Sequence, residues 1–262
     1  MAAGRLKIDI RRKKILELLA QNGQVTVTEL SELLNATQTT IRTDLDTMAA
    51  ENRLMRIPGG AIAVPAQPVQ PPVQEADPDA LAAQKRAIAA KTLSHIQDGD
   101  TLFLNSGSTT LRVAEALCAR KRLCVVTNSI RAAEVLAGYP ETHVVLLGGE
   151  INAIYGFTFG DDAVQQLERY QPAWAILSVD GVNAAQGITT YHAEEAMVNR
   201  VMFQQAHQAI IAADRRKIGR AGFTGICRLD SRFTVITDSG AKPEELDEIR
   251  ATGAAVEVAE EV

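Results

Sequence analysis

Residues 25–45 read VTVTELSELLNATQTTIRTDL, and this stretch decides the fold of the first part of the chain. Leucines recur at helical spacing in its first half, where Thr26 or Thr28 can cap a helix. After a short break, a further helix carries Ile41 and Leu45 on its inner side. Two helices joined by so short a turn predict a helix-turn-helix.

The residues on either side complete this motif. Apolar residues at helical spacing run from Ile10 to Leu19 and end before Gly23, which predicts an earlier helix. Residues 54–64 predict a small hairpin that turns at the Pro-Gly-Gly of 58–60. Three helices and a hairpin form a winged helix-turn-helix.

The early positions of the third helix are polar, as DNA recognition requires. The N-terminal part of a recognition helix meets base edges in the major groove of double-stranded DNA. Gln and Arg can pair bidentately with adenine and guanine, and a Thr methyl group can touch thymine. An ordinary exposed helix is the alternative. We predict DNA contacts from polar and basic side chains of this helix, the wing and the first helix: Gln38, Thr39, Thr40, Arg42, Thr43, Arg56, Lys13 and Lys14.

The charge of the chain is uneven. Residues 1–64 carry nine Lys and Arg against seven Asp and Glu, whereas residues 65–262 have a net charge of −7. A basic N-terminal end on an acidic body suits local contact with a polyanion, although a solvated helix face would look the same.

A proline-rich segment separates two parts of the chain. Residues 65–80 hold five of the nine prolines. Because proline fixes φ and removes an amide donor, this segment predicts a semi-extended linker. It divides a winged helix-turn-helix domain at 1–64 from a larger domain at 81–262.

The larger domain alternates β-rich runs with helical ones, which predicts an α/β domain with a mostly parallel sheet and helices on both faces. The predicted strands are 101–105, 124–127, 143–147, 173–179, 208–212, 232–237 and 255–258. Ligands of such sheets bind at the carboxyl ends of the strands.

Composition excludes several classes of protein. With 262 residues, 46% of them hydrophobic and 23% charged, the chain has the values of a globular protein of two domains. No apolar run approaches the ~18 residues of a membrane span, and no secretory signal is recognisable. The three cysteines form no CxxC pair, which predicts a reduced, cytoplasmic protein without membrane association.

Several motifs follow the linker in order: LNSGSTTL, VTNSI, LLGGE, SVDGVNAAQGITT and AADRRKIG. Together with the helix-turn-helix stretch and LMRIPGGA, they resemble the DeoR family of bacterial transcriptional repressors. The resemblance implies a winged helix that binds operator DNA and a sensor domain, similar in fold to ribose-5-phosphate isomerase, that binds a sugar phosphate. The family usually has two adjacent arginines where Arg42 and Thr43 stand, and a histidine in place of Pro58.

The run 104–111 follows a strand and opens a helix. Its glycine lets the backbone approach a ligand, and its hydroxyls and amides lie at a helix N-terminus, which is an anion site. A Ser/Thr cap of a buried helix is the alternative. In the resembling family this loop holds the phosphate of the effector, so we expect effector contacts from its central residues: Ser106, Gly107, Ser108, Thr109 and Thr110.

Two further strand ends offer polar groups. Asn128 could contact a ligand, although helix capping alone is equally consistent with its position. Asp180, next to Gly181, ends a strongly apolar strand, and an acceptor-only carboxylate suits sugar hydroxyls, so we expect effector contacts from both residues. Glu194 and Glu195 read as charges that complement a helix dipole.

The motif 212–219 places Asp214 and Lys217 in the loop after another apolar strand. Lysine is a flexible point charge suited to phosphate, and an i,i+3 ion pair between the two is the alternative. The family resemblance favours ligand contact for both. It also matches Lys85 to a lysine at the start of the sensor domain, while Arg216 either adds affinity or faces water.

Three functions remain: a repressor, a sugar-phosphate isomerase-like enzyme with an attached DNA-binding domain, and a structural module with an inactive sensor. The winged helix argues against the pure enzyme, and the polar motifs argue against the inactive sensor. No metal-ligand spacing or GxSxG motif occurs, so we expect no metal, cofactor or catalysis. The sequence predicts a repressor of a carbohydrate-utilisation operon that responds to a phosphorylated sugar and acts as a homodimer or homotetramer on pseudo-palindromic DNA.

Overall fold

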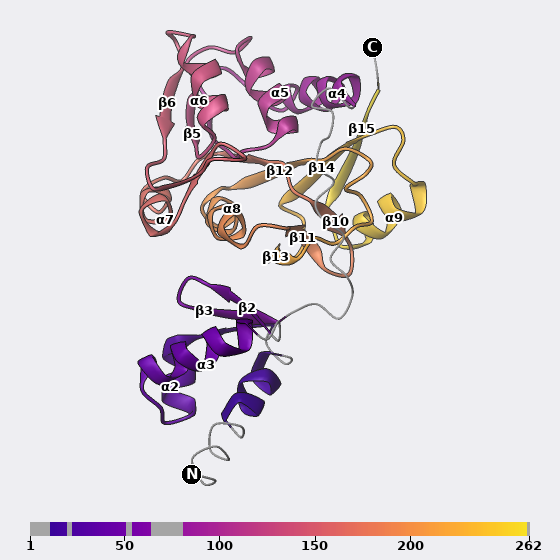
Figure 1. Cartoon of the computed structure of the whole chain (residues 1–262). Helices are drawn as coiled ribbons and strands as arrows, with labels where there is room; N and C mark the ends of the chain where they lie inside the picture. Colours follow the sequence, from indigo (N-terminus) through magenta and orange to yellow (C-terminus); the bar gives the residue numbers. More distant parts are fainter. Residues whose placement is uncertain (1–10, 20–22, 51–53, 64–80, 261–262) are drawn as a thin grey trace, which may run out of the picture. The chain divides into compact units, whose positions relative to one another are not determined.

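The computed structural model describes residues 11–19, 23–50, 54–63 and 81–260 (Figure 1). The chain divides into two compact units, 1–69 and 70–262. The predicted proline-rich linker at 65–80 lies outside the described residues, so its two boundaries with the domains stay predictions. Within the ranges given, no helix has both the length and the apolar character needed to cross a bilayer.

The N-terminal unit is a winged helix-turn-helix, as predicted. Its described strands form one antiparallel sheet in the order β1-β3-β2. The elements are a helix at 11–19, β1 (Gln24–Thr26), α2 (Val27–Leu33), α3 (Gln38–Ala50), β2 (Leu54–Ile57) and β3 (Gly60–Ala63). Their inner faces form one buried core that includes Ile15, Leu30, Ile41, Leu45 and Met48.

Local chemistry fixes where the elements of this unit begin. Of the two threonines considered as caps for α2, Thr26 is the one that caps it: its Oγ1 accepts from the Glu29 amide, and the Glu29 carboxylate accepts from the Thr26 amide. Thr37 Oγ1 accepts from the Thr40 amide at the start of α3. Gly60 is required where the wing meets β1, because a Cβ there would lie 2.1 Å from a backbone oxygen of Val25.

The C-terminal unit is built on a seven-stranded parallel sheet, so the predicted α/β fold is confirmed. The strand order is β15-β14-β12-β9-β4-β5-β6, and every neighbouring pair is parallel. The strands are β4 (Thr101–Leu104), β5 (Cys124–Thr127), β6 (His143–Leu146), β9 (Trp174–Leu177), β12 (Gln208–Ala212), β14 (Phe233–Asp238) and β15 (Ala255–Ala259). All seven correspond to strands predicted from the sequence.

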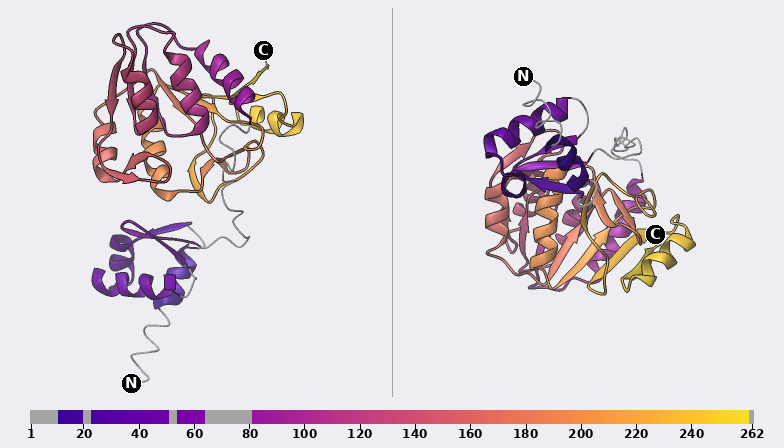
Figure 2. Two further views of the ribbon diagram at one scale, coloured as in Figure 1. Left: turned by 45° about the horizontal axis from the view of Figure 1, so that its top comes forward. Right: turned by 90° about the horizontal axis from the view of Figure 1, so that it is seen from below.

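Helices cover both faces of this sheet (Figures 1 and 2). One buried cluster joins Ile176 of β9 to helices α4 (Ala82–Leu93), α5 (Ser108–Leu117) and α6 (Ile130–Ala137). A second cluster joins the neighbouring Ala175 and Leu177 to the opposite layer, which consists of α7 (Asp161–Leu167), α8 (Ala193–Gln205) and α9 (Pro243–Ala251). Alternate residues of one strand therefore serve the two layers.

Two small sheets lie outside the main one and were not predicted. β7 (Glu150–Asn152) and β8 (Phe157–Phe159) form an antiparallel hairpin. β10 (Gly181–Asn183), β11 (Gly187–Thr190) and β13 (Thr224–Cys227) form the other sheet. Both bring loops to the carboxyl ends of the main strands.

Candidate functional site

A pocket of about 600 Å³ opens at the carboxyl ends of β4, β5 and β9 and beside the loop after β12. This is the edge of a parallel sheet at which ligands bind. Five residues that the sequence singled out line it: Ser106, Gly107, Ser108, Asp180 and Lys217. The motifs after β4, β9 and β12 therefore converge on one cavity.

The start of α5 presents backbone amides to this pocket. Gly107 is the N-cap residue, and no side chain caps the helix. A Cβ at Gly107 would lie 2.8 Å from the Cβ of Ser178, so only glycine fits between this turn and β9. First-turn amides and the positive end of the helix dipole together attract an anion. The alternative of a Ser/Thr side-chain cap is therefore not what the structure has.

A buried carboxyl network forms the floor of the pocket. Thr190 Oγ1 lies 2.8 Å from Asp180 Oδ2 and 3.0 Å from Glu195 Oε2. The Tyr191 amide also donates to Asp180 Oδ2, at 2.9 Å. Burial, together with the nearby charge of Asp180, raises the pKa of Glu195 to about 7.

The hydrogen-bond count explains how this network holds together. A hydroxyl has one proton, so Thr190 cannot donate to both carboxyl groups. When Glu195 is protonated, Thr190 can donate to the Asp180 carboxyl group and accept from Glu195. Asn105 Nδ2 supports Glu195 from the other side, at 3.5 Å from Oε1. Both carboxyl groups line the pocket.

In the loop after β12, one charged residue is buried in an ion pair and another lines the pocket. Asp214 is fully buried and accepts two hydrogen bonds from the Arg216 guanidinium, at 2.9 and 3.0 Å. Burial alone would raise the pKa of Asp214, but the hydrogen bond from Arg216 and the charge of Lys217 lower it. The Lys217 ammonium lies 3.4 Å from Ser178 Oγ, on the wall of the pocket.

Other residues expected at the site lie behind its wall. None of them is among the pocket-lining residues: Thr109, Thr110, Asn128, Gly181, Asp214 and Lys85. Asn128 Nδ2 donates to the Thr158 carbonyl, at 3.1 Å. Gly181 allows a close approach, because a Cβ there would lie 2.6 Å from the Arg220 carbonyl oxygen. Lys85 is buried within α4.

Several lining residues were not expected to contact a ligand. They share no sequence motif, and three of them are arginines whose position depends on the fold: Arg112, Arg131, Arg220, Tyr155, His192 and Glu195. Tyr155, in the β7–β8 turn, lies against His192, with ring centroids 4.6 Å apart. The VTNSI motif was the one available signal for Arg131, which follows it directly.

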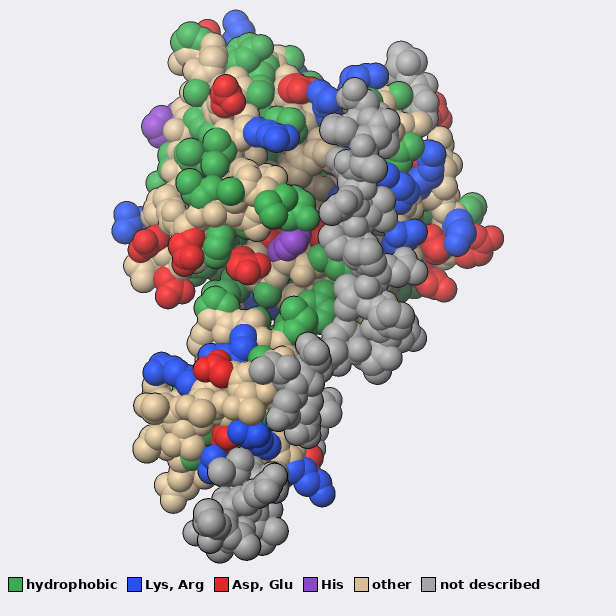
Figure 3. Space-filling view, in the orientation of Figure 1, with side chains coloured by type: hydrophobic (Ala, Val, Ile, Leu, Met, Phe, Trp, Pro, Cys, Tyr) green, Lys and Arg blue, Asp and Glu red, His purple; other side chains and the backbone are tan. Residues whose placement is uncertain are grey.

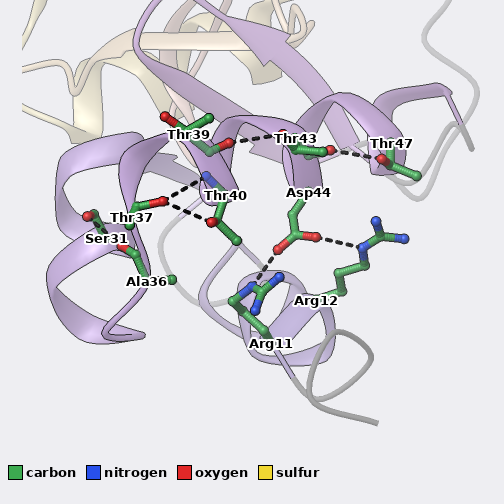
Figure 4. A network of polar contacts seen from close by, with 10 residues as sticks. All are labelled: Arg11, Arg12, Ser31, Ala36, Thr37, Thr39, Thr40, Thr43, Asp44 and Thr47. Atoms are coloured by element: carbon green, nitrogen blue, oxygen red, sulfur yellow. Dashed lines mark hydrogen bonds and ion pairs between the residues drawn. The ribbon is translucent and has the colours of Figure 1, made fainter. Parts of the chain in front are cut away.

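The recognition helix presents a polar side. Thr39, Thr43 and Thr47 lie in a row along α3, linked by hydroxyl-to-carbonyl hydrogen bonds of 3.0 and 2.8 Å (Figure 4). Gln38 and Arg42 are exposed, and Arg42 Nη2 lies 3.4 Å from Gln38 Oε1.

The remaining residues expected to contact DNA differ in exposure and in their hydrogen bonds. Thr40 is half-buried and bonded to Thr37 Oγ1. Arg56 Nε donates to Asp46 at 2.7 Å, which fixes the wing against α3. Lys13 and Lys14 are exposed on the first helix. Basic side chains are prominent on the visible face of this unit (Figure 3).

An ion-pair cluster fastens the recognition helix to the first helix. Asp44 is buried and points away from the threonine row (Figure 4). Its carboxylate accepts from the Nε atoms of Arg11 and Arg12. This structural role was not predicted, because both arginines belong to the basic N-terminal run.

Comparisons with known proteins agree with this architecture. The family described as the DeoR C terminal sensor domain matches residues 81–239, and the DeoR-like helix-turn-helix domain matches residues 11–67.

Curated relatives match most of the chain. The transcriptional repressor GlcR of Bacillus subtilis is 32% identical and covers 86% of this chain and 86% of its own. The lactose phosphotransferase system repressor of Lactococcus lactis is 30% identical, with 91% and 94% covered. The glycerol-3-phosphate regulon repressor of Escherichia coli is 28% identical, with 87% and 90% covered. Among solved structures, ribose 5-phosphate isomerase A from Neisseria gonorrhoeae matches 51% of this chain and 52% of its own, with 20% identity and a TM-score of 0.38.

Proposed function

Because the chain belongs to the DeoR family of transcriptional regulators, we propose that it represses a carbohydrate-utilisation operon and that a phosphorylated sugar changes its affinity for operator DNA. The relatives named above are repressors, and two of them are named for a lactose phosphotransferase system and a glycerol-3-phosphate regulon. The observation that carries the effector part is the uncapped start of α5, which opens into the same pocket as Lys217. A regulator of this kind acts in the cytoplasm, where its operator is.

We assign the two ends of the ligand from chemistry. A phosphate dianion needs both amide donors and a cation, which the Ser106–Ser108 turn and Lys217 supply together. Asp180 lines the pocket with carboxyl oxygens that accept hydrogen bonds, so it suits the hydroxyl groups of the sugar. Residues behind the wall, such as Asn128 and Asp214, position these groups and do not contact the ligand.

We assign DNA reading to the exposed side of α3. Gln38 and Arg42 lie at its N-terminal half, where a recognition helix meets base edges. Thr39 and Thr43 offer methyl groups on the same side. Lys13 and Lys14 add attraction to phosphates that does not depend on sequence.

The response requires coupling between the two units. A ligand shifts an equilibrium only if it binds one arrangement better than the other. We propose that the C-terminal units associate as a homodimer or homotetramer and set the spacing of the DNA-binding units, with effector binding favouring one spacing.

The alternative function is an isomerase that retains a DNA-binding domain. The observation that favours it is the carboxyl group of Glu195, whose pKa of about 7 suits proton transfer. We favour the regulator, because the curated relatives that match most of this chain are named as transcriptional repressors. An isomerase assay on any sugar phosphate that binds distinguishes the two: turnover supports the enzyme, and saturable binding without turnover supports the regulator.

The test of the effector site is Lys217→Ala. DNA selected by the protein from a random pool serves as the operator, and gel shift measures its affinity with and without sugar phosphates. The variant is expected to bind operator as the parent does but to lose the response. Lys121→Ala, an exposed lysine outside the pocket, is the matched control. Loss of operator binding with intact effector affinity would show that this loop transmits structure and does not bind the ligand.

A further inference from the structure

The β7–β8 hairpin supplies an apolar side to the pocket. Three residues at and beside its turn line the cavity: Ile154, Tyr155 and Phe157. Phe157 is buried, whereas Tyr155 is 41% exposed. Polar groups that line the same cavity, such as Ser106 and Asp180, come from other segments. The pocket therefore combines hydrogen-bonding groups with an exposed aromatic residue.

Hydrogen bonds hold the turn that carries Tyr155. Asn152 Oδ1 accepts from the amides of Ile154 and Tyr155, both at 3.2 Å. The Gly156 amide donates to the Asn152 carbonyl at 2.8 Å, and the Gly156 carbonyl accepts from the Ile130 amide at the start of α6, at 3.0 Å. The turn is thus tied both within itself and to the main layers of the domain. Tyr155 is a preformed part of the pocket wall, so little order has to be gained when a ligand binds.

Two contacts place Tyr155 between the proposed phosphate turn and the surroundings of Asp180. Ser106 Oγ, in the turn before α5, lies 3.4 Å from the Tyr155 carbonyl oxygen. The Tyr155 ring lies against that of His192, with ring centroids 4.6 Å apart. His192 directly follows Tyr191, whose amide donates to Asp180. Tyr155 therefore lies along the stretch that joins the phosphate of the effector to its hydroxyl groups.

A sugar in its closed-ring form matches this combination of groups. The faces of a pyranose ring present C–H bonds, whereas its equatorial hydroxyl groups point outward around the edge. The face of an aromatic ring carries partial negative charge, so it attracts C–H hydrogens and also covers apolar surface. An open-chain sugar presents no such continuous face, because its carbons rotate about single bonds and its hydroxyl groups point in all directions.

We propose that Tyr155 stacks on the sugar of the effector and makes the pocket specific for a sugar phosphate in the pyranose form. The proposal rests on the effector site described above, with the phosphate at the start of α5 and Lys217. Tyr155 is then a specificity-determining residue. The phosphate contributes affinity that all sugar phosphates share, and the aromatic ring distinguishes a closed sugar ring from an open chain.

Calorimetry on the full chain tests this with probes that differ in ring closure: the 6-phosphates of glucose, mannose and galactose against those of glucitol, mannitol and galactitol. Each alditol keeps the carbon chain and the phosphate of its aldose but cannot close. The parent protein is expected to bind one of the aldose phosphates at least tenfold tighter than its alditol. Part of this preference reflects the flexibility of the alditol, so the ratio of the two affinities is compared between variants.

The variant Tyr155→Ala is expected to reduce this ratio at least fivefold, because the aldose phosphate loses its stacking partner. Tyr155→Phe keeps the aromatic ring and should keep the ratio. Tyr139→Ala removes an exposed tyrosine outside the pocket, so it is the matched control and should change neither affinity.

The outcomes separate this inference from the proposed function. If Tyr155→Ala weakens the aldose and the alditol phosphate equally, or weakens neither, Tyr155 does not select the ring form and the inference is refuted, although the effector site stands. If the parent binds both members of each pair equally, or binds only sugar phosphates without a pyranose ring, the inference is refuted in the same way. If no sugar phosphate binds at all, the effector site itself is wrong, and this inference falls with it.

Discussion

Glu195→Gln tests the buried carboxyl network through the pH dependence of stability. In the unfolded chain this carboxyl group has its ordinary pKa of 4.5, and in the folded protein its pKa is about 7. As the pH rises, the unfolded state loses its proton first, so unfolding becomes easier between these two values and levels off above the second. The gap between the two pKa values corresponds to about 3 kcal/mol.

Glutamine keeps the shape of protonated glutamate and can still donate to Thr190, but it has no charge to bury. At pH 5 we expect Glu195→Gln to differ from the parent by less than about 1 kcal/mol. At pH 8.5 the variant should be more stable by about 2–3 kcal/mol. The parent curve should fall between pH 4.5 and about 7 relative to that of the variant.

The single tryptophan of the chain makes the assay specific. Trp174 lies in β9 of the C-terminal unit, so its fluorescence during urea unfolding reports this unit and not the winged helix. Glu194→Gln, the half-buried preceding residue outside the pocket lining, is the control. A difference between parent and Glu195→Gln that is constant from pH 5 to 8.5 would refute the protonated carboxyl and the hydrogen-bond direction inferred from it.

Three other variants test separate parts of the molecule. Asp44→Ala removes the carboxylate that pairs with Arg11 and Arg12, whose side chains are about one-fifth exposed. Opening of the winged helix should therefore become easier by about 1–3 kcal/mol, as measured by amide exchange in α3. Unchanged exchange would mean that the ion-pair cluster is not structural. Gly107→Ala places a Cβ 2.8 Å from that of Ser178, so phosphate affinity should fall by calorimetry while operator binding persists; unaltered phosphate affinity would contradict the turn's role. Arg42→Ala should weaken operator binding by about 1–3 kcal/mol in gel shift and leave the affinity for random DNA unchanged. An equal loss of affinity for both DNAs would show that Arg42 does not contact base edges.

The main sheet could be predicted because its strands are short apolar runs that alternate with helical ones. All seven strands were found this way, since a strand covered on both faces has a mostly apolar sequence. The small sheets could not be found. Glu150–Asn152, for example, has three residues and only one apolar side chain, so neither an apolar run nor an alternation marks it as a strand.

The candidate site was predictable to the extent that it follows strand ends. The runs containing Gly107, Asp180 and Lys217 each come directly after a strand, so parallel topology alone brings them together. The pairing of Glu195 with Asn105 spans ninety positions of sequence. The raised pKa of Glu195 arises from its burial and from the charge of Asp180, which no local pattern records. Its place in the first turn of α8 suggested only a charge that complements the helix dipole.

The AADRRKIG motif shows where sequence spacing is ambiguous and geometry decides. Spacing allowed an ion pair between Asp214 and Lys217, which would have left neither free for a ligand. In the structure Arg216 takes the carboxylate instead, with two hydrogen bonds that match its planar fork to both carboxylate oxygens. A lysine offers only a point charge and cannot make that match. The consequence is that Asp214 is neutralised behind the wall while the Lys217 ammonium remains beside Ser178, where an incoming phosphate can replace the weak 3.4 Å contact.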